Sequence, residues 1–161
     1  MISNLADLIK TNLEYKDGNL FWTKTSGRKI KGKKAGCPNK GYVMVGLNGK
    51  LYSAHRIIFF MHKGFCPQFI DHIDGNRSNN KIENLRPATI NENARNSKKP
   101  SHNTSGYKGV CWDKNRNKWM AHITINNKFK SLGRFDEIES ARLAYANAAK
   151  KYFGEFARIE K

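Results

Sequence analysis

The chain has 161 residues, of which 39% are hydrophobic and 11% aromatic, so it has the material for one ordinary domain or two small ones and is not disordered by composition. Thirty basic residues against thirteen acidic ones give a net charge of +17, and the stretch between Asp17 and Asp71 holds ten Lys and Arg but no acidic residue. Six of these ten fall within Lys24–Lys34. The excess favours a polyanionic partner, DNA or RNA, over a membrane surface, because no amphipathic helix accompanies the charge.

Several classes of protein are excluded at this stage. No apolar run approaches the roughly 18 residues that a membrane helix needs, and residues 1–7 have none of the features of a secretory signal. The three cysteines, Cys37, Cys66 and Cys111, include no C-x-x-C pair, which argues against a structural zinc site and for a reducing environment. We therefore expect a cytoplasmic protein.

The N-terminal half reads as a short helix followed by strands. Residues 1–14 place Leu5, Leu8 and Ile9 at helical spacing. Residues 15–70 are β-rich, with strands expected at 19–23, 41–47 and 50–54. Asn48-Gly49 predicts a type I′ hairpin turn, because both central residues of that turn need a positive φ. A helix is then expected over 55–63, ended by Gly64.

The C-terminal part begins after a polar stretch without hydrophobic periodicity. We expect an N-terminal domain over 1–97, a linker over 98–105 and a second domain over 106–161. Residues 119–125 alternate between apolar and polar side chains, Asn126-Asn127 forms a turn and 128–135 form another strand, although the alternation fails over 128–132. A helix follows to about Phe153, with a capping box of Asp136 and Glu139. This pattern predicts a three-stranded antiparallel sheet with one helix.

The segment from Ile70 to Asn93 holds the parts of a phosphodiesterase site. Hydrolysis of a phosphodiester needs an activated water and a cation that neutralises the developing charge. Asp71 and Asn93 offer the hard oxygens that suit Mg²⁺ or Mn²⁺, and His72 offers a base that works near neutral pH. A calcium-binding EF-hand is excluded, because a loop with Gly75 at its sixth position has Lys81 where a bidentate Glu is required.

The run Asp71-His-Ile-Asp-Gly75, Asn79-Asn80, Glu83-Asn-Leu85 and Asn91-Glu-Asn93, preceded by His55-Arg56, resembles the HNH nucleases and, more narrowly, the homing endonucleases of phages and introns. The resemblance implies a ββα-metal fold with His72 as general base and Asp71 and Asn93 as metal ligands. It also implies that Asn84 pins the loop and orients His72. Arg56 and Arg77 are expected to contact phosphate. His55 is left open, either as a packed residue or as a catalytic one. Asn93 stands where the family name has His, a change that the homing branch accepts.

A second resemblance covers the tail. Ser105-Gly-Tyr-Lys-Gly-Val-Cys-Trp112, Lys118–Ile123, Leu132-Gly-Arg-Phe135 and Ala141–Tyr145 are similar to the AP2 domain, whose sheet lies in the major groove of DNA while its helix backs the sheet. Cys111 stands where the plant members carry Arg. The expected DNA contacts are Lys108, Trp112, Lys114, Arg116, Lys118, His122, Thr124, Lys128 and Arg134.

The sequence thus predicts an α+β protein with an N-terminal ββα-metal HNH nuclease domain and a C-terminal AP2-like sheet and helix. Its expected activity is Mg²⁺- or Mn²⁺-dependent cleavage of double-stranded DNA by a phage- or mobile-element-encoded homing endonuclease, acting as a monomer or weak dimer. The main alternative is a DNA-binding transcriptional regulator without catalytic activity. An RNA-binding or RNA-cutting protein is a third reading, disfavoured because the chain lacks the exposed aromatic platform of single-strand binders.

Overall fold

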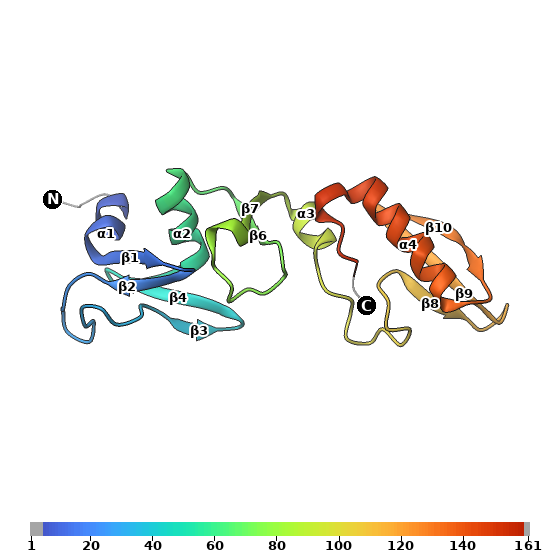
Figure 1. Ribbon diagram of the computed structural model, residues 1–161, viewed down its shortest axis with the longest axis horizontal. Helices are drawn as coiled ribbons and strands as arrows, with labels where there is room; N and C mark the ends of the chain where they lie inside the picture. Colours follow the sequence, from blue (N-terminus) through green and yellow to red (C-terminus); the bar gives the residue numbers. More distant parts are fainter. Residues whose placement is uncertain (1–4, 160–161) are drawn as a thin grey trace. The chain divides into compact units, whose positions relative to one another are not determined.

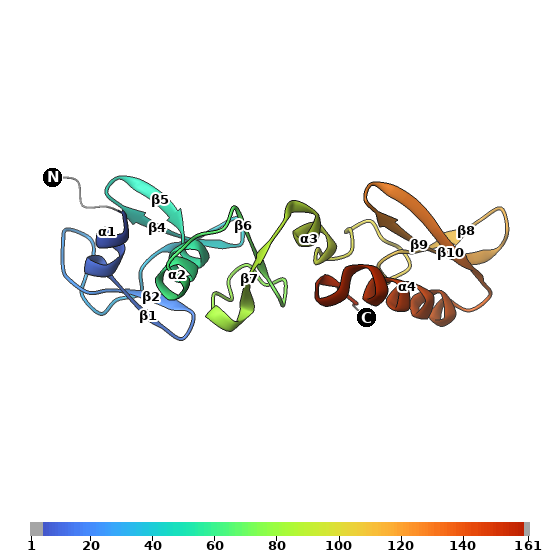
Figure 2. The same cartoon turned by 90° about the horizontal axis from the view of Figure 1, so that it is seen from above.

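The computed structural model describes residues 5–159, and the chain divides into two compact units between Thr89 and Ile90 (Figures 1 and 2). Each unit combines small antiparallel sheets with helices, which confirms the predicted α+β class. The division lies before the polar stretch expected as a linker at 98–105, because the short helix of residues 90–95 packs with the C-terminal elements. The part of the helix expected over residues 1–4 lies outside the described residues.

The N-terminal unit contains three small sheets. Its elements in chain order are α1 (Leu5–Asn12), β1 (Leu13–Lys16), β2 (Asn19–Trp22), β3 (Cys37–Asn39), β4 (Tyr42–Leu47), β5 (Lys50–Ser53), α2 (Ala54–Lys63), β6 (Phe69–His72), η1 (Ile82–Asn84) and β7 (Leu85–Ala88). The strands pair as β1-β2, β3-β4-β5 and β6-β7. The first helix is shorter than expected, because Leu13 leaves it to pair with Trp22 in the β1–β2 hairpin.

Helix α2 forms the centre of this unit. Its Ile57, Ile58 and Phe59 are at most 3% exposed and pack in one cluster with Val45 and Leu47 of β4. The helix ends at Gly64, whose left-handed φ of 76° allows its N–H to bond the carbonyl of Phe60, as predicted. The β4–β5 hairpin turns at Asn48-Gly49 with positive φ at both residues, which confirms the predicted turn.

The C-terminal unit is a three-stranded sheet covered on one face by a helix (Figure 2). Its elements are α3 (Ile90–Arg95), β8 (Val110–Asp113), β9 (Lys118–Ile125), β10 (Lys128–Phe135), α4 (Ile138–Phe153) and η2 (Gly154–Phe156). The strand order is β10-β9-β8, with Asn126-Asn127 forming the β9–β10 turn. This arrangement confirms the predicted sheet and helix.

Small residues let α4 lie close to the sheet. Ala141 and Ala149 are fully buried against Ala121, which is also fully buried in the middle of β9. Gly109, just before β8, faces the ring of Tyr145 so closely that an added Cβ would lie 2.1 Å from the ring. Any side chain at this position would push the helix from the sheet.

Two local expectations for this unit need revision. The capping box is wrong: the N-cap of α4 is Glu137 and no side chain caps the helix, since Asp136 pairs with Lys118 and Glu139 accepts a bond from Tyr107. The failed alternation over 128–132 has a structural cause, a register shift between Ser131 and Gly133 that places an extra residue in β10.

No helix of residues 5–159 is long and apolar enough to cross a membrane.

Candidate active site and nucleic-acid interface

A loop closed by amide side chains joins β6 to η1 and shapes the site. The side-chain nitrogen of Asn84 donates to Asp74 Oδ1 (3.0 Å) and to the carbonyl of Asn79 (2.8 Å), while its oxygen accepts the N–H of Asp74 (3.0 Å). Although partial burial acts to raise it, the bonds from Asn79, Asn76 and Asn84 together lower the pKa of the Asp74 carboxyl. Asn84 therefore sits where it pins the loop.

His72, the last residue of β6, is 5% exposed and is held by a different amide. Its Nε2 lies 3.1 Å from Oδ1 of Asn80, which is itself 3% exposed. An amide oxygen only accepts hydrogen bonds, so Nε2 carries the proton and Nδ1 keeps its lone pair. The contact expected from Asn84 as the residue that orients His72 is thus made by Asn80.

Asp71, next to His72, forms an ion pair across the β6–β7 hairpin. The register places Asp71 opposite Arg86, and Nε and Nη2 of Arg86 donate to Asp71 Oδ2 at 2.9 and 2.8 Å. Only 4% of the Asp71 side chain and 12% of the Arg86 side chain is exposed. A buried carboxylate requires such a partner, because desolvation of an unpaired charge is costly.

Asn93, the other expected metal ligand, is an exposed residue of α3 in the C-terminal unit. The residues from 5 to 159 contain no group of three or more His, Cys, Asp or Glu placed to hold a metal ion. Two oxygen ligands nevertheless suit Mg²⁺, which usually keeps several waters and needs few protein ligands.

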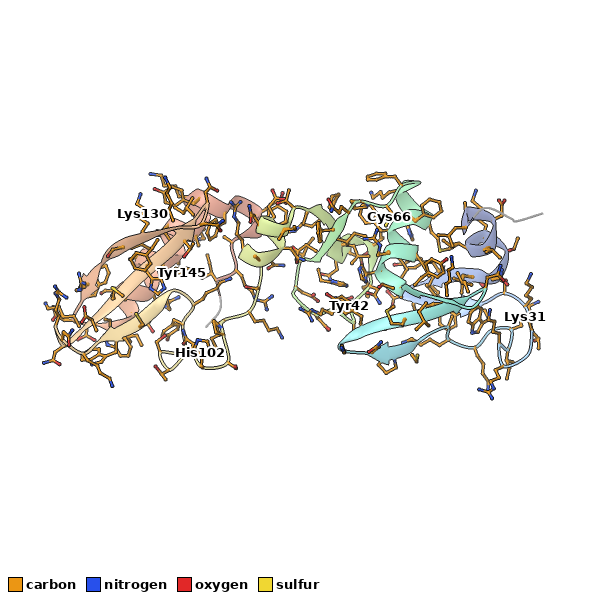
Figure 3. The ribbon with its side chains drawn as sticks, turned by 180° about the vertical axis from the view of Figure 1, so that it is seen from behind. Lys31, Tyr42, Cys66, His102, Lys130 and Tyr145 are labelled. Carbon is orange, nitrogen blue, oxygen red and sulfur yellow. The ribbon has the colours of Figure 1, made fainter. Side chains whose placement is uncertain are left out.

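His72 lies in a group of rings that includes Tyr42 and His55. The ring of His55 lies 5.1 Å from that of His72 and 5.3 Å from that of Tyr42. Tyr42 is the first residue of β4 (Figure 3). The guanidinium of Arg77 lies 5.0 Å from the centre of the Tyr42 ring. Of the two arginines expected to contact phosphate, Arg77 thus borders the group around His72, while Arg56 donates to the carbonyl of Gln68.

In the C-terminal unit, the sheet face away from α4 carries a charged cluster around Asp113. Arg134 Nε donates to Asp113 Oδ2 at 2.7 Å, and Arg116 lies 3.6 Å from the same oxygen. The hydrogen bond from Arg134 is the main cause that lowers the pKa of Asp113. Lys118 pairs with Asp136 at 3.0 Å. Arg116, Lys118 and Arg134, all expected DNA contacts, are therefore oriented by carboxylates before any DNA binds.

His122, Thr124 and Phe129 extend the same face. Register pairs Thr124 with Phe129, and the Phe129 ring, which is 61% exposed, stacks on that of His122 at 5.1 Å. Burial lowers the pKa of His122. Lys114 and Lys128 are exposed. Trp112, expected among the contacts, pairs with Trp119 at a ring distance of 5.0 Å, and this register puts it on the face that carries α4.

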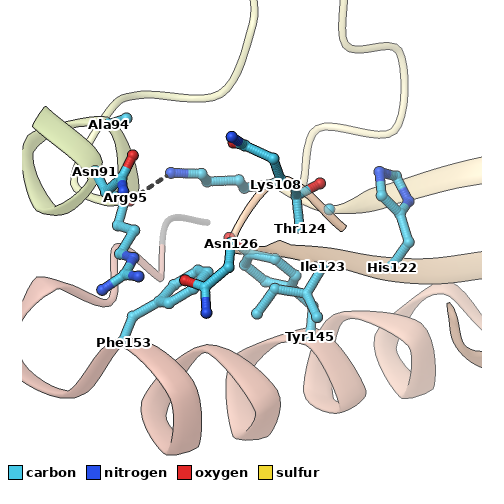
Figure 4. A pocket seen from close by; sticks show the side chains of 12 residues that line it. Asn91, Ala94, Arg95, Lys108, His122, Ile123, Thr124, Asn126, Tyr145 and Phe153 are labelled. Atoms are coloured by element: carbon cyan, nitrogen blue, oxygen red, sulfur yellow. Dashed lines mark hydrogen bonds between the residues drawn. The ribbon is translucent and has the colours of Figure 1, made fainter. Parts of the chain in front are cut away.

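Lys108 has a different environment from the other expected contacts. Its Nζ donates to the carbonyls of Arg95 and Ser97, both at 2.7 Å (Figure 4). It lines a cavity of about 320 Å³ between α3, the end of β9 and α4, where Arg95 lies over the ring of Phe153. Lys108 thus bonds the chain at the C-terminal end of α3.

Three residues of these sites were not identified from the sequence. Asn80 was quoted in the Asn79-Asn80 pair of the HNH resemblance, but no role was assigned to it. Arg86 could have been found from hairpin pairing, because residues 71 and 86 face each other if 72 pairs with 85. Phe129 was hidden by the irregular strand β10, and no sequence signal indicates its face.

Comparison with protein-family descriptions assigns both units. The HNH endonuclease family matches residues 52–95, which include Asp71, His72, Asn84 and Asn93. The AP2 domain matches residues 105–155. Protein 3.8 of Escherichia phage T7 is 40% identical over 91 residues, which cover 56% of this chain and 74% of the phage protein. The chain belongs to the HNH endonuclease family.

A second relative of this HNH protein is the uncharacterized HNH endonuclease L560 of Acanthamoeba polyphaga mimivirus, 33% identical over 110 residues. The match covers 66% of this chain and 56% of the mimivirus protein. Both relatives are viral. No solved structure matches the chain. The HNH and AP2 domains together indicate that the protein binds DNA.

Proposed function

We propose that this HNH protein is a divalent-metal-dependent endonuclease of homing type that hydrolyses phosphodiester bonds of double-stranded DNA. The observation that carries the proposal is the environment of His72. The imidazole is buried beside the buried carboxylate of Asp71, and its contact with Asn80 places the proton on Nε2 and the lone pair on Nδ1. A protein that only binds DNA has no need of a buried histidine beside a buried carboxylate. Burying these polar groups destabilises the fold, which favours a catalytic role for them.

In the proposed reaction, Nδ1 of His72 takes a proton from a water molecule, and the resulting hydroxide attacks phosphorus in line with the 3′ oxygen. The P–O3′ bond breaks and the departing oxygen takes a proton from solvent water, so the products carry a 5′ phosphate and a 3′ hydroxyl. Asn80 holds the imidazole in the required tautomer through its 3.1 Å contact. The loop pinned by Asn84 keeps Asn80 in place.

Asp71 and Asn93 would hold the metal ion, because a carboxylate and an amide oxygen are ligands of the hardness that Mg²⁺ and Mn²⁺ prefer. When bound, such an ion neutralises charge that develops on the phosphate and the leaving oxygen. Arg86 fixes the orientation of the Asp71 carboxylate.

The AP2 domain is proposed to anchor the protein on duplex DNA through the sheet face that carries Arg116, Lys118 and Arg134. A single nuclease site in a monomer predicts a nick, and a double-strand break would need two chains or two events. Trp112 and Lys108 remain proposed contacts whose present partners lie within the protein.

A plasmid assay tests the proposal. With Mg²⁺ or Mn²⁺, the wild-type protein should convert supercoiled plasmid to the relaxed form, and EDTA should abolish the conversion. His72→Ala should lower the rate by at least about 100-fold, the size expected for loss of a general base, while it still retards a DNA fragment on a gel. If the wild-type protein binds DNA but does not cut it with any divalent ion, the protein is the DNA-binding regulator instead.

A further inference from the structure

His55 is a buried histidine without a hydrogen-bond partner at Nδ1. It lies in the first turn of α2, is 8% exposed, and its Nδ1 is shielded from solvent. A buried polar atom without a partner destabilises the folded state, so a packed side chain at such a place is usually apolar. The imidazole is therefore kept here against a cost to stability.

The ring of His55 forms one side of the space around the expected base. It meets the His72 ring edge-on at 5.1 Å with an angle of 65° between the planes, and it lies 5.3 Å from Tyr42. Tyr42 in turn lies 6.2 Å from His72 and beneath Arg77. A substrate bound at His72 would thus also lie close to His55, whose ring is 5.1 Å away.

The position of the proton on His55 follows from burial. Proteins tolerate a buried acceptor without a partner more readily than a buried N–H without one, since orphaned N–H groups are the rarer of the two. Nε2 is therefore the nitrogen that carries the proton. Burial, together with the nearby His72 and Arg56, lowers the pKa of His55 to about 4, so the ring is neutral at physiological pH and does not serve as a general acid.

We propose that His55 is a second catalytic histidine, whose Nε2–H donates a hydrogen bond to a non-bridging oxygen of the phosphodiester attacked at His72. The assignment rests on the proposed function. A neutral donor at this place strengthens its bond as charge builds on the phosphate, and it needs no rearrangement in a site already shaped by the protein. No proton is transferred by His55.

Three substitutions separate this role from packing. His55→Phe keeps a ring of similar shape and removes the donor. His55→Gln places an amide N–H near the position of Nε2, whereas His55→Asn reaches only the position of Nδ1. His62→Phe is the matched control, because it is the same exchange on the same helix, at a residue whose ring packs on that of Tyr15 and whose Nδ1 lies 2.9 Å from the carbonyl of Ile58.

The readouts are plasmid-nicking kinetics, dissociation constants for a DNA fragment, and thermal unfolding of the full chain. We expect His55→Phe and His55→Asn to lower kcat by about 10- to 100-fold with DNA affinity within twofold, and His55→Gln to retain most of the rate. His62→Phe should cut at the wild-type rate. If His55→Phe cuts like the wild type, or if the loss follows unfolding temperature in all three variants, His55 is a packing residue. Absence of cleavage by the wild type would instead overturn the proposed function.

Discussion

Buried polar residues mark the functional site of this protein at the scale of single side chains. Six polar or charged residues among 5–159 are buried, and all but Asn96 belong to the group around the β6–β7 loop: His55, Asp71, His72, Asn80 and Asn84. A core that serves only stability would not contain so many polar residues, since each buried polar group needs a hydrogen-bond partner or destabilises the fold. Five buried polar residues gathered around one loop are the physical sign of a functional site.

His55 gives the stability of the protein a pH dependence of known sign. Its pKa is about 4 in the folded chain and 6.5 in the unfolded chain, so the unfolded state takes up the proton first. Above pH 6.5 the ring is neutral in both states and has no pH-dependent effect, and as the pH falls from 6.5 toward 4 the folded state loses stability relative to the unfolded state, by up to about 3 kcal/mol for a shift of this size. Chemical denaturation at pH 7.5, 6 and 5 measures the loss.

His55→Phe is the control for that measurement, because it removes the titrating group and keeps the ring. As the pH falls across this range, the unfolding free energy of the wild type should decrease more than that of the variant. Parallel curves for the two proteins would show that His55 does not titrate with a lowered pKa.

At the scale of elements, α3 falls within the HNH family match but packs in the C-terminal unit, which carries the AP2 domain. The HNH match ends at residue 95, yet α3 packs with η2, and Lys108 and Arg158 donate to carbonyls of residues 95–97. A helix of six residues has little stability of its own, so these contacts fix it. The element that carries Asn93 therefore depends on the AP2 unit for its structure.

Lys108→Met tests this dependence. The exchange keeps the length of the side chain and removes two bonds to carbonyls, each from a charged donor, so we expect a loss of about 1–3 kcal/mol and a fall of roughly 5 °C or more in Tm. Lys114→Met is the matched control, since Lys114 is exposed and the change in charge is the same. Weaker DNA binding by Lys108→Met with an unchanged Tm would show that Lys108 contacts DNA and does not stabilise α3.

At the scale of the whole molecule, positive charge is the dominant property. The chain carries +17, and the loop between β2 and β3 presents Lys31, Lys33 and Lys34 as exposed residues. Its backbone is fixed by bonds between Trp22 and both Gly32 and Lys33. An ordered cationic loop of this kind is suited to phosphate contacts.

The salt dependence of DNA affinity should report this loop. Each phosphate neutralised contributes about −0.9 to the slope of log K against log salt concentration on duplex DNA. Replacing Lys31, Lys33 and Lys34 with Gln should make the slope of the wild type less steep by up to about 3, as measured by fluorescence anisotropy between 50 and 300 mM salt. The triple Arg variant keeps the charge and should keep the slope. Equal slopes for the Gln variant and the wild type would exclude the loop from the interface.

Local sequence signals determined the elements that depend on short-range chemistry. The Asn48-Gly49 turn, the end of α2 at Gly64 and the alternation of β9 were all predicted and are confirmed, because turn geometry and strand period are properties of neighbouring residues. The residues quoted between 70 and 93 likewise carried the resemblance to the HNH family, which the family comparison confirms.

Tertiary structure alone decided which side chains meet. His72 is contacted by Asn80 rather than Asn84 and lies against His55, and Asp71 is neutralised by Arg86. Lys108 bonds the end of α3. All of these contacts join residues that are 8 to 17 positions apart. The sequence gives the spacing of these residues along the chain, but strand register and the path of each loop set the direction of their side chains. Those are decided only when the whole unit packs and its buried polar groups find their partners.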